Sequence, residues 1–113
     1  MAITNEQVSE HRFLEEMFGD TYFPDHLVER GKQILLRFCE RIEAERPADL
    51  PALYALSAAA TAEFNELQED FWAAGSEIET AARDCIAVDF GFVATAYGFP
   101  NADLEELVAD RDW

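Results

Sequence analysis

The stretch GSEIETAARDCIAVDFGFVATAYG, residues 75–98, decides the fold because it carries the signals for both ends of one long helix. Ser76 followed three residues later by Glu79 has the spacing of a capping box, in which each side chain accepts from the other residue's backbone N–H. Gly98 suits the left-handed position that follows a helix, and Pro100 lies just past it. The stretch therefore predicts a helix that begins near Ser76 and ends just before Gly98.

A single carboxylate, Asp89, lies in the middle of the apolar face of this helix. At 100° per residue it falls between Cys85 and Val93. A buried carboxylate must be paired, hydrogen-bonded or protonated. One interpretation is a buried polar centre, for which the candidate partners are Tyr54, Gln68, Arg41 and His26. Another is a functional pocket, with Tyr22, Tyr54, His26 or Arg83 close to the carboxylate. The third is that this side of the helix faces water or another subunit.

The rest of the chain shows the 3.6-residue period of amphipathic helices, with capping signals between them. The expected helices run from a Thr4–Gln7 capping box to about Met17, from Pro24 to about Glu45, from an Asp49 cap to about Ala73, and over a short stretch within 102–110. No strand alternation or linker interrupts this pattern. The sequence therefore predicts a single all-α domain over residues 1–113, an irregular four-helix bundle with a short fifth helix at the C-terminus.

Two residues of the helix expected over 24–45 depart from its pattern. Gly31 lies in the inward stripe, where it costs up to about 1 kcal/mol relative to alanine. Close approach of another helix could offset this cost. Leu36 points nearly opposite the stripe, so it is either exposed or covered by a partner. Leu36 is therefore the candidate interface residue, and we expect a homodimer or another protein partner.

The charge is the unusual feature of the composition. The 113 residues contain 24 Asp and Glu against 8 Lys and Arg, which gives a net charge of −16. Because binding to phosphates draws on Lys and Arg, direct binding to nucleic acid or to an anionic membrane is disfavoured. Solubility, a basic protein partner and mimicry of a nucleic-acid backbone remain as interpretations of the charge.

Cys39 and Cys85 both fall inside helical patterns, where a free cysteine behaves as a small apolar residue. Residues 1–20 lack the apolar core of a secretory signal, and no apolar run approaches the length of a membrane span. We therefore expect a cytoplasmic protein with reduced thiols.

The signatures of common active sites are absent from the sequence. A di-iron bundle needs Glu-x-x-His, but Val8 and Phe23 stand three residues before His11 and His26. His11 with Glu15, or His26 with Asp25 and Asp20, could form only adventitious metal sites. There is no Gly-x-Ser-x-Gly, no glycine-rich phosphate loop, and no zinc spacing with two cysteines. The sequence predicts no catalytic residue, metal or cofactor.

Three stretches carry a family resemblance: MFGDTYFPDHLVERGKQIL (17–35), FNELQEDFWAAGSEIETAARDCIAVDF (64–90) and the closing RDW. Together they resemble a family of small bacterial proteins of unknown function. The resemblance covers nearly the whole chain and implies a compact helical domain. It implies no activity, substrate or cofactor, so no functional residue is transferred.

Three functions remain open from the sequence. The first is a small non-enzymatic interaction or regulatory domain. The second is an enzyme or a small-ligand pocket built around Asp89. The third is an acidic mimic of nucleic acid that covers a basic protein, although the acidic residues are spread over every expected helix.

Overall fold

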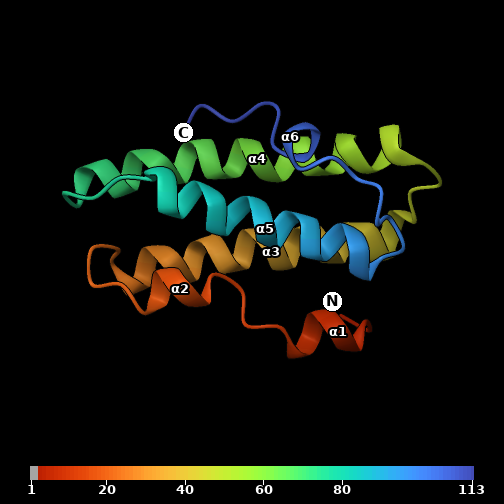
Figure 1. The fold of residues 1–113 in the computed structure, drawn as a ribbon, viewed down its shortest axis with the longest axis horizontal. Helices are drawn as coiled ribbons and strands as arrows, with labels where there is room; N and C mark the ends of the chain where they lie inside the picture. The colour runs from red at the N-terminus through yellow and green to blue at the C-terminus, as the bar shows by residue number, and fades with distance from the viewer. Residues whose placement is uncertain (1–2) are drawn as a thin grey trace.

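The computed structural model describes residues 3–113 and is all-α, as predicted. In chain order its helices are α1 (Glu6–Glu10), α2 (Glu15–Phe18), α3 (Asp25–Glu45), α4 (Leu50–Ala73), α5 (Thr80–Ala96) and α6 (Leu104–Leu107). The three long helices α3, α4 and α5 form the body of the molecule, and α6 packs on α4 and α5 (Figure 1). Within residues 3–113, no helix is both long enough and apolar enough to cross a membrane.

The sequence signals at the ends of α3 and α4 are confirmed. Pro24 is the N-cap of α3, and Arg46 ends the helix in the left-handed conformation directly before Pro47. The carboxylate of Asp49 accepts from the N–H of Ala52 at 3.0 Å and so caps α4. Gly98, with φ of 91°, follows α5 in the left-handed position as predicted.

The predicted capping box at the start of α5 is wrong. The helix begins at Thr80, and the side chain of its N-cap residue, Glu79, makes no capping hydrogen bond. Gly75 and Ser76 instead belong to the end of α4. Gly75 has φ of 80° and donates its N–H to the carbonyl of Trp72, and Ser76 donates to the carbonyl of Phe71. This is a Schellman ending, which uses the glycine of the GSEIET string to stop one helix rather than to begin the next.

The first predicted helix is also wrong, because it is broken into α1 and α2. Asn5, not Thr4, caps α1 by accepting from the N–H of Val8 at 3.2 Å. The backbone becomes extended at His11 and then takes the left-handed conformation at Leu14, with φ of 56°. A non-glycine residue in this conformation is strained and needs support from its surroundings.

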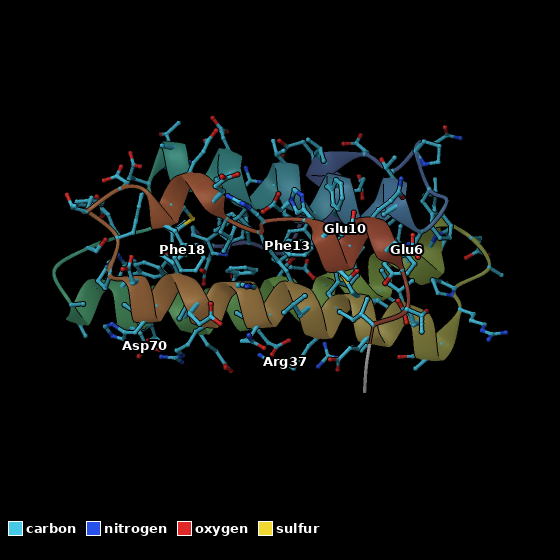
Figure 2. The ribbon with its side chains drawn as sticks, turned by 90° about the horizontal axis from the view of Figure 1, so that it is seen from below. Glu6, Glu10, Phe13, Phe18, Arg37 and Asp70 are labelled. Carbon is cyan, nitrogen blue, oxygen red and sulfur yellow. The ribbon has the colours of Figure 1, made fainter. Side chains whose placement is uncertain are left out.

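We call residues 3–18, which comprise α1, α2 and the segment between them, the N-terminal strap. Both views place the strap along one side of the molecule, where α3 and α5 lie next to each other (Figures 1 and 2). Both α1 and α2 contact α5, and α2 also contacts α3. The aromatic ring of Phe13 is buried, whereas Glu6 and Glu10 on α1 are exposed.

One apolar cluster contains buried residues from the strap, from all three long helices and from the C-terminal segment. At its centre, Phe90 of α5 packs against Phe38 of α3 and Phe64 of α4, with ring centroids 5.4 and 5.9 Å apart. The prediction for Gly31 is confirmed, because a Cβ there would lie 3.0 Å from Leu14 and 3.1 Å from Phe64. Gly31 thus lets the strap and α4 approach α3 closely.

Candidate functional site

Asp89 is buried on α5, and its carboxylate is satisfied by two donors from the N-terminal strap. Oδ1 lies 2.9 Å from Nε2 of His11. Oδ2 accepts from the backbone N–H of Leu14 at 2.7 Å. Of the states that the sequence left open for this carboxylate, the structure has it hydrogen-bonded, and its partners are not the four residues proposed from the sequence.

The break in the strap creates this arrangement. In a continuous helix the N–H of Leu14 would bond the carbonyl four residues earlier. In the structure the left-handed backbone at Leu14 leaves its N–H for Asp89 instead. The hydrogen bond to a buried carboxylate supports the strained backbone, since charge-assisted bonds are the stronger kind.

The ring of His11 is held by packing as well as by Asp89. It stacks on Phe92 of α5, with centroids 3.9 Å apart and planes 15° from parallel, and it lies edge-on to Phe13. Its side chain is 26% exposed. Because an ionised Asp89 can only accept, Nε2 of His11 must carry the hydrogen in their bond. Among residues 3–113 no hydrogen bond engages Nδ1, so this atom is left as an acceptor in the neutral ring.

An open hollow of about 260 Å³ adjoins the pair of His11 and Asp89. Its lining comes from the strap and from α5: His11, Arg12, Glu15, Glu16, Asp84, Cys85, Val88 and Asp89. Val88 is 59% exposed and supplies an apolar wall. The hollow therefore combines a fixed imidazole, an apolar surface and several exposed charges.

The thiol of Cys85 also lines the hollow but is not suited to nucleophilic chemistry. Burial, followed by the negative charges of Asp89 and Glu16, raises the pKa of Cys85 to about 11. The thiolate is the reactive form of cysteine. At neutral pH Cys85 is therefore an unreactive, weakly polar part of the wall.

The other residues predicted to lie near Asp89 are elsewhere. The hydroxyl of Tyr54 accepts from the N–H of Asp103 at 3.1 Å near the start of α6. His26 is exposed on the first turn of α3, and Tyr22 is exposed in the preceding loop. Arg83 lines a second, smaller cavity at the C-terminal end of the chain, together with Trp113. Two further candidates, Gln68 and Arg41, bond Asp112 and Glu63 instead.

Leu36, the candidate interface residue, is half-buried and packs against the core of its own chain. Cys39 and Cys85 are both free.

Sequence reasoning missed His11 as the partner of Asp89. The sequence predicted one continuous helix from Thr4 to about Met17, and His11 was considered only as part of an adventitious metal site with Glu15. The strap contains no glycine or proline between Asn5 and Phe18 that would have signalled the break. The available signal was chemical, because His11 is one of only two histidines in a chain that buries a carboxylate.

A second polar cluster fastens the start of the strap, and it centres on Glu43 of α3. The Glu43 carboxylate accepts from the N–H groups of Thr4 and Asn5, from the Thr4 hydroxyl and from the hydroxyl of Tyr97. Burial opposes ionisation of Glu43, but the bonds from Tyr97, Thr4 and Asn5 outweigh it and lower the pKa of the carboxyl. The side-chain amide of Asn5 also donates to the carbonyl of Ala96 at 2.9 Å.

No group of three His, Cys, Asp or Glu side chains within residues 3–113 is placed to hold a metal ion. What the hollow can do chemically thus rests on the imidazole of His11 and the charges around it.

Residues 7–113 match the model of DUF5713, a family of unknown function, so the chain belongs to this family. Comparison with curated proteins and with solved structures finds no match.

Proposed function

We propose that this protein is a small-ligand-binding domain whose site is the hollow over His11 and Asp89. The observation that carries the proposal is the pair of buried Asp89 and partly exposed His11 at the wall of an open hollow of about 260 Å³. Pockets for small molecules combine apolar walls with a few fixed polar groups. Here Val88 is the apolar wall and His11 is the fixed polar group. A carboxylate–imidazole pair that only stabilises the fold does not require an adjoining hollow.

The pair would position an acceptor atom for the ligand. Asp89 holds the hydrogen of His11 on Nε2, while the stacking on Phe92 fixes the plane of the ring. Nδ1 of the neutral ring can then accept a hydrogen bond, or a proton, from a bound molecule. The geometry therefore supports the binding of a small molecule, with transfer of a proton between that molecule and His11 as the chemistry open to the site.

The two histidines make a direct test possible. A set of small amines, alcohols and carboxylates is added to protein labelled with ¹³C in its histidine rings, and both ring signals are followed by NMR. We expect at least one compound class to shift the His11 signal in a saturable way while exposed His26 remains unchanged as the internal control. If no compound moves His11, or if both histidines move together, the hollow is not a ligand site.

A second candidate function, a protein-interaction or regulatory domain, is favoured by two exposed aromatic side chains. Trp72 at the end of α4 is 54% exposed and Tyr22 is 45% exposed. Tryptophan and tyrosine are enriched where proteins bind each other. Light scattering would detect a homodimer, and a dimer unaffected by Trp72→Ala would remove this residue from the interface.

The negative charge supports a third, weaker candidate, a mimic of nucleic acid that covers a basic protein. It requires carboxylates on one continuous face. For each of these functions we propose a cytoplasmic setting, which the free thiols support. The proposed bacterial origin rests on the family resemblance alone.

A further inference from the structure

Negative charges outnumber positive charges around the hollow. Three exposed carboxylates, those of Glu15, Glu16 and Asp84, face one guanidinium, that of Arg12. Arg12 lies 3.6 Å from Glu15 and is 83% exposed, so its charge is directed to that neighbour and to solvent. No basic side chain within residues 3–113 lies at ion-pair distance from Glu16 or Asp84.

The carboxylate of Asp89 already has hydrogen-bond partners, in contrast to those of Glu16 and Asp84 within the described part of the chain. Its carboxylate takes hydrogen bonds from His11 and from the N–H of Leu14. The two carboxylates without a counter-charge come from different elements, Glu16 from α2 and Asp84 from α5. A ligand in the hollow would therefore lie between negative charges on both walls.

The hydrogen-bonding character of the hollow agrees with its charge. In its neutral form, with the hydrogen on Nε2, His11 offers an acceptor at Nδ1. The carboxylates of Glu16 and Asp84 are acceptors as well, so these three groups require donors. The guanidinium of Arg12, the donor in the lining, is directed to Glu15 and to solvent. Burial raises the pKa of the Cys85 thiol, and the negative charges of Asp89 and Glu16, which also act on it, add to this effect.

We propose that the hollow binds a small organic cation, a protonated amine that donates to Nδ1 of His11 and lies between the carboxylates of Glu16 and Asp84. An ammonium group has several N–H donors and no acceptor, which matches the acceptors of His11, Glu16 and Asp84. The apolar part of the molecule covers Val88, which is exposed without it. A bare metal ion fits poorly, because no three ligating side chains converge within residues 3–113. The inference rests on the proposed function, because it names the ligand class of the same site.

Three probes of nearly equal size and different charge test the inference: benzylamine, benzyl alcohol and benzoate. Each is titrated at pH 8 into protein with ¹³C-labelled histidine rings. Exposed ion pairs contribute little individually, so two of them predict an affinity for benzylamine about five- to tenfold above that for benzyl alcohol. Benzoate should bind least, and added salt should reduce the preference for the amine.

Two double variants separate the local charges from the net charge of the protein. Glu16→Gln with Asp84→Asn should abolish the preference for benzylamine over benzyl alcohol. Glu66→Gln with Glu69→Gln changes the net charge equally on the exposed face of α4 and should leave the preference intact.

The possible failures are distinguishable. If none of the three probes shifts His11, both the ligand site and the inference are overturned. If benzyl alcohol or benzoate binds as well as benzylamine, the site stands and the cation is wrong. If the two double variants lose the preference equally, the overall charge of the protein causes it, and the assignment to Glu16 and Asp84 is wrong.

Discussion

Asp89 illustrates at the residue scale how one buried carboxylate organises its surroundings. Asp89→Leu removes the acceptor and leaves the N–H of Leu14 without a partner, for which we expect a loss of about 1–3 kcal/mol in the free energy of unfolding. Urea denaturation measures this loss. Asp84→Asn, on the exposed side of the same helix, is the control and should change stability by less than about 0.5 kcal/mol. An Asp89→Leu protein as stable as this control would show that the carboxylate does not support the strap.

Asp89→Asn is expected to have a smaller effect because His11 can adapt to it. The amide oxygen keeps the bond from Leu14, and the amide N–H₂ can donate to Nε2 once the hydrogen of His11 has moved to Nδ1. In the variant the ¹⁵N chemical shift of Nδ1 should therefore become that of a protonated ring nitrogen, and the shift of Nε2 that of an unprotonated one. Unchanged nitrogen shifts in the variant would contradict the assignment of the hydrogen to Nε2.

The reactivity of Cys85 follows from its environment. Burial and the charges of Asp89 and Glu16 raise its pKa from 9.0 to about 11, a difference of two units. At pH 8 the thiolate fraction, and with it the rate of alkylation by iodoacetamide, should be about a hundredfold lower than for an ordinary cysteine. The rate should rise steeply towards pH 11. Mass spectrometry locates the modification, and rapid labelling of Cys85 at pH 8 would contradict the raised pKa.

The attachment of the N-terminal strap depends on pH through Glu43. Because its bonds lower the pKa of Glu43, that carboxylate stabilises the strap above the ordinary value of 4.5, and the contribution is lost as the pH falls through the lowered pKa. We expect the amide signals of Thr4 and Asn5 to shift together as the pH falls below 4.5. In Glu43→Gln this acid transition should be absent. A transition of the same midpoint in the variant would assign it to another group.

The sequence predicted the helix ends that are set by local capping and turn residues. It failed where tertiary contacts determine the backbone conformation. The Pro24 start, the Asp49 cap and Gly98 are local signals, and each lies where it was expected. The Ser76 cap failed because the same glycine–serine pair can end one helix or begin another. The strap broke because Asp89, seventy-five residues from Leu14, offers its N–H a stronger acceptor than a helix would.

Only one half of the candidate site, Asp89, could be predicted from the sequence. The helical wheel identified Asp89 as a buried carboxylate, because α5 is a regular helix. The wheel could not identify His11, because it assumed that the strap was regular as well. Only the fold brings the two residues together, at an irregularity that no local pattern predicts.

At the scale of the whole molecule, the three long helices meet at Phe90. Its ring contacts Phe38 of α3 and Phe64 of α4, so Phe90→Ala should open a cavity at the centre and cost about 3–5 kcal/mol. This is a large part of the stability of a domain of this size. Exposed Val88→Ala should cost less than about 0.5 kcal/mol in the same urea titration. A small effect of Phe90→Ala would mean that the helices do not share one core.

We propose above that a small molecule binds in the hollow formed by the strap and α5. The most direct measurement is the nuclear Overhauser effect between benzylamine and ¹³C-labelled protein, because it locates the bound molecule. We predict contacts from its protons to the methyl groups of Val88 and to the ring of His11. Contacts to Trp72 or Tyr22 instead, or no contacts at saturating benzylamine, would contradict the account.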